Sequence, residues 1–406
     1  MTPRSFLRAA PLLLAAATLL TACAERLPSD AGARNPLTPR PTVTPTTPWA
    51  SLDGGQSFAC GLASGGQAYC YGRNAYGNLG DSSAANSSVP VAVWQQGESY
   101  SQVTAGAFHA CGIAAGGQAW CWGANADGRL GDSTTATLPL IPVKVKPHGA
   151  VAFTSLSAAD LHTCGLDSGG QGYCWGSGAD GRLGNNSKTS ALTPVAVQQG
   201  ATTFTQIQAG FWHTCALDNG GQAYCWGYGA DGALGYGFSF GDSIPHAVSQ
   251  PLGVTFSSIY TEYKHVCALD SGGQAYCWGP NGSSQLGDST ITRSYTPVAT
   301  RMPAGVTYSK LALAAASTCG LSTAGQAYCW GAGSNGQLGH GSTASSRLPV
   351  AVSQPSGVTF TDIRAESQAY CALDTVGQTW CWGQNTWGGL GDGSTTNRTS
   401  PVAVVH

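Results

Sequence analysis

The chain has 406 residues and a formal net charge of −2, and only 9% of its residues are charged. Globular proteins usually carry about 25% charged residues, so most of this surface must be built from Ser, Thr, Asn, Gln and Gly. Without clustered Lys and Arg, the composition excludes an electrostatic nucleic-acid-binding surface and weighs against chromatin as a partner.

The first 22 residues have the pattern of a bacterial signal peptide. Arg4 and Arg8 precede an apolar run, 9–20, which is shorter than the roughly 20 residues that span a bilayer. The Leu-Thr-Ala-Cys sequence that ends at Cys23 then resembles a lipobox, which implies that Cys23 is lipidated and becomes the new N-terminus. An ordinary signal peptide followed by a stray thiol is the alternative. We expect an exported lipoprotein, held by its lipid at a membrane outside the cytoplasm, in the periplasm or at the cell surface.

Residues 23–48 follow as a tether. Six prolines and many threonines occur between residues 24 and 48. Such a composition cannot bury a core and favours an extended chain. We expect this segment to hold the remaining chain, 49–406, away from the membrane.

Fourteen of the fifteen cysteines form seven pairs with the same Cys-x9-Cys spacing, and the first cysteines recur every 51 to 53 residues. The chain is therefore seven copies of one unit. Zinc sites combine closer pairs with two further ligands, so zinc is not expected, and buried free thiols are the alternative to disulfides. The pairs are Cys60 with Cys70, Cys111 with Cys121, Cys164 with Cys174, Cys215 with Cys225, Cys267 with Cys277, Cys319 with Cys329, and Cys371 with Cys381.

The fourth copy shows the local structure most clearly. Two short apolar runs, 213–217 and 222–226, flank Asp-Asn-Gly-Gly, which predicts a strand, a tight turn and a strand. Opposed residues of an antiparallel hairpin have a constant index sum, so Cys215 faces Cys225 when the turn centres on Gly220. Directly opposed Cα atoms lie roughly 4.5–5.5 Å apart, a separation that a disulfide tolerates. We therefore expect one disulfide within each hairpin.

Each copy also predicts a strand on either side of its hairpin. An aromatic and an aliphatic residue three apart, such as Phe204 and Ile207, precede the hairpin, and a glycine-rich turn with Pro-Val-Ala-Val or a variant follows it. Four strands in about 50 residues, repeated seven times, predict an all-β fold, a seven-bladed β-propeller over residues 49–406. An open β-solenoid is the alternative, although its coils are much shorter. We expect blades offset from the repeats, so that the C-terminal strand at 401–404 completes the first blade.

The repeat motifs resemble those of a known family. The unit Gly-x-x-His-Thr-Cys-Ala-Leu, Gly-Gln-Ala-Tyr-Cys-Trp-Gly, Gly-x-Leu-Gly-Asp and Pro-Val-x-Val is similar to the RCC1 repeat of the regulator of chromosome condensation family, most closely at 123–131 and 331–339. The resemblance implies a seven-bladed ring with a narrow central channel. A guanine-nucleotide exchange role, which the nuclear founding member has, is a poor expectation for an exported chain. The paired cysteines are similar to those of an exported bacterial subgroup.

Six tryptophans share one repeat position, directly after the second cysteine. Side chains that recur at one position of every blade are expected to form the core between blades. They are Trp122, Trp175, Trp226, Trp278, Trp330 and Trp382.

Four histidines, His109, His162, His213 and His265, stand two residues before the first cysteine of repeats two to five. Equivalent positions in different blades are a blade-to-blade step apart, so we expect structural hydrogen bonds rather than a metal or catalytic cluster. Glycine-rich turns at 125–128 and 179–181 faintly resemble calcium loops, but their Asp/Asn-Gly steps are typical of turns. We assign no catalytic residue, no metal ligand and no cofactor.

Three acidic residues, Asp160, Glu262 and Glu366, lie at or directly after the step before the hairpin that reads Ala-Gly in the second and fourth repeats. We expect solvated turn residues. If this step lies near the channel mouth, the three would instead form a weakly acidic rim.

One loop departs from its siblings and is the candidate partner-binding site. Where most repeats continue with Asp-Ser or similar polar residues after Gly-x-Leu-Gly, the fourth has Tyr236, Phe238 and Phe240. Exposed loop aromatics are enriched at binding hot spots, although local packing of the loop on the ring is the alternative. The candidate residues are Tyr228, Tyr236, Phe238, Phe240, Tyr260 and Tyr263.

Together these observations predict a non-catalytic, monomeric protein-interaction module of the cell envelope, with an envelope or extracellular protein as its partner. Low charge with surface tryptophan and tyrosine also suits a carbohydrate-binding or glycan-active protein. A propeller enzyme with its site in the channel mouth is the third hypothesis.

Overall fold

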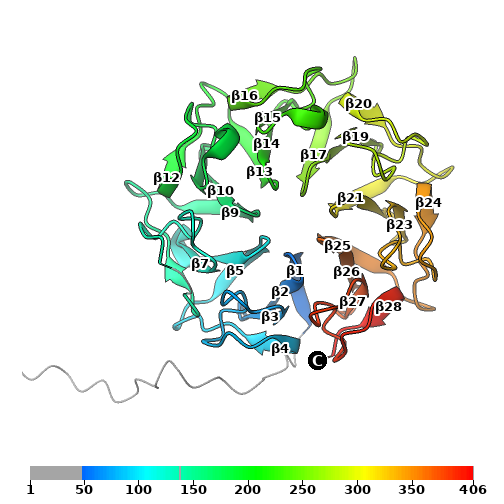
Figure 1. The fold of residues 1–406 in the computed structure, drawn as a ribbon, viewed down its shortest axis with the longest axis horizontal. Coiled ribbons are helices and arrows are strands. Elements are labelled where there is room, and N and C mark those ends of the chain that lie inside the picture. Colours follow the sequence, from blue (N-terminus) through cyan, green and yellow to red (C-terminus); the bar gives the residue numbers. More distant parts are fainter. Residues whose placement is uncertain (1–47, 137–138, 406) are drawn as a thin grey trace, which may run out of the picture. The chain divides into compact units, whose positions relative to one another are not determined.

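The computed structural model describes residues 48–136 and 139–405, which form seven four-stranded antiparallel sheets arranged as a ring (Figure 1). The all-β, seven-bladed propeller is therefore confirmed. The predicted signal peptide at 1–22, the lipidated Cys23 and the tether up to residue 47 lie outside the described residues. Within the described part of the chain, no helix has the length and apolar character needed to cross a membrane.

Each blade uses four successive strands, and the first of them lies innermost (Figure 1). The first strands are β1 (Trp49–Gly54), β5 (Tyr100–Ala105), β9 (Phe153–Ala158), β13 (Phe204–Ala209), β17 (Phe256–Thr261), β21 (Tyr308–Leu313) and β25 (Phe360–Glu366). The second strands are β2 (Phe58–Ala63), β6 (His109–Ala114), β10 (His162–Asp167), β14 (His213–Asp218), β18 (Val266–Asp270), β22 (Ser317–Ser322) and β26 (Ala369–Asp374). The third strands are β3 (Ala68–Gly72), β7 (Ala119–Gly123), β11 (Gly172–Gly176), β15 (Ala223–Gly227), β19 (Ala275–Gly279), β23 (Ala327–Gly331) and β27 (Thr379–Gly383). The outer strands are β4 (Ser87–Ala92), β8 (Val143–Lys144), β12 (Ala191–Ala196), β16 (Asp242–Ala247), β20 (Ser294–Ala299), β24 (Ser346–Ala351) and β28 (Arg398–Ala403).

This antiparallel order gives the ring two different faces. The turns between first and second strands and the long loops between third and fourth strands emerge on one side, which we call the loop face. The hairpins between second and third strands and the linkers between blades emerge on the other, which we call the hairpin face. The short 3₁₀ turns η2 (Ala179–Gly181) and η3 (Ala230–Gly232) belong to the loop face, and η1 (Ala115–Gly117) belongs to the hairpin face.

The hairpin register follows the cysteine arithmetic. Cys215 pairs with Cys225 and Leu217 with Ala223, as predicted from the constant index sum. All seven cysteine pairs are disulfide-bonded within their own hairpins, with Cα–Cα distances of 4.0–4.1 Å, slightly shorter than the expected separation. Seven disulfides are typical of a protein that folds in an oxidising environment outside the cytoplasm. The predicted pairing is confirmed at every position, and free thiols are excluded there, because bonds join Cys60 to Cys70, Cys111 to Cys121, Cys164 to Cys174, Cys215 to Cys225, Cys267 to Cys277, Cys319 to Cys329, and Cys371 to Cys381.

The seams between blades are built on the repeated tryptophan. Trp278 of blade 5 is fully buried, and its Nε1–H donates to the carbonyl of Ala233 in blade 4 at 3.1 Å. Gly235 in the same loop has a φ of +73°, and a Cβ there would lie 2.7 Å from Nε1 of Trp278. Glycine is thus required here both by the backbone and by the ring that covers it. All six tryptophans of this position are fully buried, which confirms their core role.

The expected offset between blades and repeats is wrong. β28 pairs with β27 in blade 7, and β1 pairs with β2 in blade 1, so each repeat supplies one complete blade. The closing seam is made by side chains instead. Tyr71 stands in the tryptophan position, with its hydroxyl 3.8 Å from Sγ of Cys381, and Arg364 Nε donates to the carbonyl of Leu52 at 3.0 Å. Because one contiguous repeat satisfies all four strands, no strand has to be exchanged across the closure.

Candidate functional site

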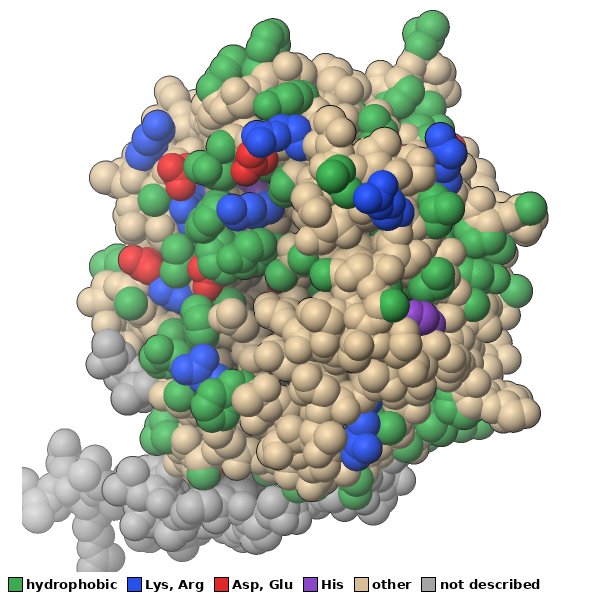
Figure 2. Space-filling model, turned by 45° about the vertical axis from the view of Figure 1, so that its right-hand side comes forward, with side chains coloured by type: hydrophobic (Ala, Val, Ile, Leu, Met, Phe, Trp, Pro, Cys, Tyr) green, Lys and Arg blue, Asp and Glu red, His purple; other side chains and the backbone are tan. Residues whose placement is uncertain are grey.

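The loop face carries most of the chemical variety of the ring. Figure 2 shows most of the visible acidic side chains, together with several Lys and Arg side chains, in one region at the upper left of the view. The rest of that surface is largely polar and uncharged, as the composition predicted. Charged and aromatic residues of the inner turns and loops are therefore the natural place to look for a site.

The four histidines are structural. Each imidazole Nε2 lies 2.6–2.9 Å from a threonine hydroxyl of the next blade. Thr214 also donates to the carbonyl of Arg182, so its oxygen accepts from the Nε2–H of His162. Burial lowers the pKa of all four imidazoles, to about 3 for His213 and His265, and keeps them neutral. The hydrogen-bonding role is confirmed by the pairs His109 with Thr163, His162 with Thr214, His213 with Thr261, and His265 with Thr318.

The Asp/Asn-Gly steps form turns, as predicted. Asp180 and Asp231 adopt φ values of 60° and 62°, the left-handed region that aspartate tolerates better than most residues. The Asn125 amide donates to Asp132 Oδ1 at 3.1 Å, while its oxygen accepts from the N–H of Leu130. These polar side chains hold their own loops together.

The three acidic residues of the inner turns do not share one environment, and two of them are not solvated as expected. Asp160 is 6% exposed and Glu366 is 3% exposed, because a neighbouring blade packs against each of their turns. Burial raises the pKa of Asp160 to about 6, although Arg129 and Arg182 oppose this, and burial raises the pKa of Glu366 well above its usual value. Each keeps one carboxylate oxygen without a hydrogen-bond partner among the described residues. Glu262 alone of the three remains partly exposed and lines the channel.

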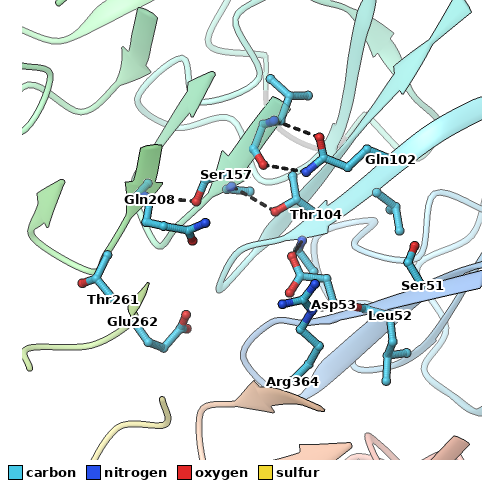
Figure 3. A pocket seen from close by; sticks show the side chains of 15 residues that line it. Ser51, Leu52, Asp53, Gln102, Thr104, Ser157, Gln208, Thr261, Glu262 and Arg364 are labelled. Atoms are coloured by element: carbon cyan, nitrogen blue, oxygen red, sulfur yellow. Dashed lines mark hydrogen bonds between the residues drawn. The ribbon is translucent and has the colours of Figure 1, made fainter. Parts of the chain in front are cut away.

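The channel contains a cavity of about 150 Å³. Its walls are the first strands of several blades, and Figure 3 shows polar side chains pointing into it from opposite sides. Glu262, directly after β17, faces Asp53 of β1 and Arg364 of β25 across the space. The polar wall comprises Asp53, Thr104, Ser157, Gln208, Glu262 and Arg364.

One side of the channel is a series of charges. Lys310 and Asp362 form an ion pair, and Nη2 of Arg364 lies 3.6 Å from Oδ2 of Asp362. Burial lowers the pKa of Lys310 to about 8, while Asp362 opposes this shift. Sequence reasoning missed this series. A comparison of first strands across repeats would have found it, because at these positions the other repeats carry uncharged residues, apart from Asp53 of the first repeat.

The opposite side is neutral and mostly engaged in holding blades together. Nε2 of Gln102 donates to the carbonyl of Leu156 at 2.9 Å, and its Oε1 accepts from the N–H of the same residue at 3.0 Å. Ser157 accepts the N–H of Ala209 at 3.0 Å. No hydrogen bond engages the side chain of Gln208 within the described residues, so its amide is available to the cavity.

In the aromatic loop of blade 4, one of the three aromatic side chains packs on the ring and the other two are exposed. Tyr236 is 5% exposed, packs against His246 with 4.7 Å between ring centroids, and donates its hydroxyl to the carbonyl of Phe240. Phe238 and Phe240 are each 59% exposed, with their rings stacked 5.4 Å apart. Tyr236 is therefore the base of the loop, and the two phenylalanines form its exposed tip.

Two of the other predicted residues lie in a separate cluster. Tyr228 and Tyr263 flank Trp212, at centroid distances of 5.2 and 6.2 Å, and Phe211 lies 4.5 Å from Tyr263. The ammonium of Lys264 sits 4.5 Å above the Trp212 ring. We call these five residues the blade 4–5 cluster. It joins the inner turns of blades 4 and 5 on the loop face.

Tyr260 does not belong to either aromatic group. It lies on β17 and packs against the core between blades 5 and 6, and burial raises the pKa of its phenol. Its place in the predicted patch is wrong, because its strand position directs it to the blade seam rather than to the turn.

A third aromatic group was missed. Arg73 lies over the rings of Tyr76, Phe108 and Trp387 at 5.6–6.0 Å, joining blades 7, 1 and 2 on the loop face. Tyr76 is 39% exposed and Trp387 is 46% exposed. These residues come from three repeats, so no single sequence segment signals them.

Comparisons with known proteins agree with this architecture. The model of the RCC1-like domain matches residues 91–406, and that of the regulator of chromosome condensation (RCC1) repeat matches residues 65–113. The ultraviolet-B receptor UVR8 of Arabidopsis thaliana is 28% identical over 314 residues, covering 75% of this chain and 71% of the receptor. The E3 ubiquitin-protein ligase HERC2 of Homo sapiens is 26% identical over 308 residues, 75% of this chain but 6% of that protein.

Solved structures show the same fold. Prp20p of Saccharomyces cerevisiae has a TM-score of 0.73 at 20% identity, covering 90% of this chain and 88% of that one. Human WBSCR16 has a TM-score of 0.72 at 22% identity, covering 79% and 85%. The chain belongs to the RCC1-repeat family of β-propellers.

Proposed function

We propose that this protein is a non-catalytic protein-interaction module whose partner binds the loop face. The observation that carries the proposal is the exposed, stacked pair Phe238 and Phe240, supported from below by buried Tyr236. A tip of two aromatic rings on a braced base loses little conformational entropy on binding, which is what a hot spot needs. The blade 4–5 cluster extends the aromatic surface toward the channel.

The location of the chain's entry into the ring supports this choice of face. Pro48 and Trp49 lie beside the hairpin at Gly377, where the N–H of Trp49 donates to the carbonyl of Gly377. The chain thus joins the ring on the hairpin face. The first described residues therefore leave the loop face uncovered and open to a partner.

Export and lipidation are part of the proposal. The signal-like residues 1–22, the lipobox-like sequence before Cys23 and the seven disulfides all favour a bacterial envelope lipoprotein. Mass spectrometry of the protein purified from membranes tests this. We expect an N-terminal peptide that begins at Cys23 and carries acyl chains. A Cys23→Ala variant should leave the membrane fraction, and an unmodified N-terminus would refute the anchor.

The partner-binding role is tested by a crosslinking pull-down from native envelopes. A double variant, Phe238→Ala with Phe240→Ala, should lower capture of the main partner about tenfold or more, as hot-spot truncations do. The matched control is Leu252→Ala with Val376→Ala, which removes two exposed apolar residues from the hairpin face. Equal capture by wild type and the phenylalanine variant would reject the loop tip as the binding site.

A carbohydrate ligand is the second candidate, favoured by the exposed rings of Tyr76 and Trp387 beside Arg73. Sugars stack on such rings. A glycan array distinguishes the two candidates: Trp387→Ala should abolish glycan binding while leaving protein capture unchanged.

A further inference from the structure

The charges around the central cavity do not balance. Lys310 and Asp362 pair with each other. This leaves the carboxylates of Asp53 and Glu262 facing the guanidinium of Arg364, which already donates to the Leu52 carbonyl (Figure 3). Asp53 is partly satisfied, since its carboxylate accepts the N–H groups of Gly54 and Ala105. When both of these carboxyl groups are ionised, one negative charge therefore lacks a compensating cation.

Glu262 is the group without a partner. No hydrogen bond or ion pair engages its carboxylate within residues 48–136 and 139–405. In the other repeats this position, five before the first cysteine, holds glycine or alanine, with one exception. A carboxylate is therefore not required there to build a blade. The glycine and alanine residues are Gly55, Gly106, Ala159, Gly210 and Ala314. Glu366, the exception, lies in the closing seam and does not reach the cavity.

We propose that the cavity binds a primary ammonium group, supplied by a lysine side chain of the protein partner. This identification of the ligand rests on the proposed interaction function. An ammonium has three donors and no acceptor. Glu262, Asp53 and the free amide oxygen of Gln208 supply acceptors around the same space.

The size and composition of the cavity select among cations. Its volume of about 150 Å³ admits the end of a lysine side chain but not a folded segment. A divalent metal would need several anionic ligands close together, and no cluster of three or more metal-binding side chains exists in the described part of the chain. A single positive charge balances the single excess negative charge.

Binding should release a proton and tighten as pH rises. Burial raises the pKa of Glu262 well above its usual value, and Asp53 and Asp160 raise it further. An ammonium beside the carboxylate opposes all three effects, so the complex favours the ionised acid. The other titratable or charged groups around this part of the channel are Asp53, Asp160, Lys310, Asp362, Arg364, His213 and Tyr370.

The test uses n-butylammonium as the probe and n-butanol as its neutral counterpart, titrated into the intact protein by calorimetry at pH 8. We expect binding of the amine alone, with proton release seen as a dependence of the heat on the buffer. Glu262→Ala should weaken binding at least about tenfold, because a charge-assisted hydrogen bond is lost. Glu366→Ala, the same change at the same repeat position, should leave binding unchanged. Absence of amine binding, equal binding of butanol, or equal affinity in both variants would overturn the proposal.

Partner capture by the same variants identifies the source of the ammonium. A Glu262→Ala protein that binds neither amine nor partner places a lysine of the partner in the cavity. If Glu262→Ala loses the amine but still captures the partner, the assignment of the ligand to a partner lysine is overturned, and the cavity takes a free amine instead. Because the amine titration contains no partner, its result does not depend on whether Phe238 and Phe240 form the interaction site, so the two proposals fail separately. Thermal melting of each variant confirms that the ring is intact.

Discussion

The hydroxyl of Thr261 in blade 5 lies 2.6 Å from Nε2 of His213 in blade 4. It takes the place of a threonine hydroxyl that blade 5 does not supply at the usual position. At the other three histidine seams the partner is the residue before the first cysteine, but in blade 5 that position holds Val266. Most other repeats have alanine where Thr261 stands. The equivalent residues are Ala105, Ala158, Ala209 and Ala365. Two departures from the repeat pattern thus compensate one another.

Removing the Thr261 hydroxyl should lower the stability of the protein, and placing a threonine hydroxyl at position 266 instead should restore it. Thr261→Ala leaves buried His213 without its partner, and we expect a loss of about 1–3 kcal/mol in guanidinium unfolding. Adding Val266→Thr to that variant rebuilds the arrangement of the neighbouring seams and should recover most of the loss. A double variant no more stable than Thr261→Ala would contradict this pairing.

The buried histidines should make the ring sensitive to acid. Their folded-state pKa values lie below the ordinary 6.5, at about 3 for His213, because burial disfavours the charged form. The stability they contribute is complete above pH 6.5 and is lost as pH falls toward about 3, where only the unfolded chain gains protons. Each such histidine adds about 1.4 kcal/mol per pH unit to that loss. His213→Gln should flatten the pH dependence of the unfolding free energy by about one proton, and a dependence that stays unchanged would contradict the prediction.

The seam glycines should resist substitution for two separable reasons. Gly253, in a linker, has a φ of +78° and nothing near its absent Cβ, so Gly253→Ala should cost only the backbone strain of about 1–2 kcal/mol. Gly235→Ala adds the collision with the Trp278 ring, and we expect at least about 3 kcal/mol in total. Chemical unfolding of both variants measures the difference. Equal losses would show that the indole moves aside freely.

Glu366 should destabilise the closing seam at neutral pH. Because burial raises its folded-state pKa, the stability of its protonated form is present below about pH 4.5 and is lost as pH rises through the folded-state value. Glu366→Ala should therefore stabilise the protein by about 1–3 kcal/mol at pH 8 and by less at pH 4.5. Unfolding at both pH values tests this, with Glu98→Ala as a control on the hairpin face. A gain that does not change with pH would indicate a packing effect.

The periodic part of this structure was predictable because it is local. Cys215 and Cys225 fixed the register of their hairpin by arithmetic alone, and the recurrence of Trp226 marked the seam. Ring closure was not predictable in the same way. The phase of a repeat does not say which sheet its last strand joins, because that depends on the backbone pairing of β28 with β27.

The candidate sites were harder to predict because they depend on where separate repeats converge. Glu262 and Glu366 occupy the same repeat position, yet one lines the cavity and the other lies in the closing seam. Tyr260 and Tyr263 are three residues apart, yet they lie in a blade core and on the loop face, respectively. Deviations from the repeat pattern pointed to these residues, but only the three-dimensional arrangement shows which side chains surround each of them.

Each sequence repeat forms one complete blade, and this has a consequence for how the gene can evolve. A duplication or loss of one stretch of about 52 codons in the gene would add or remove a complete sheet together with its own cross-link. No surviving sheet would lose a strand, and only the junctions flanking the change would have to be rebuilt. In a ring that closes by strand exchange, the terminal strands share one sheet, so the same event at either end of the gene would break it. This architecture therefore lets ring size vary by unequal recombination anywhere along the array, while loop-face residues diversify independently in each copy.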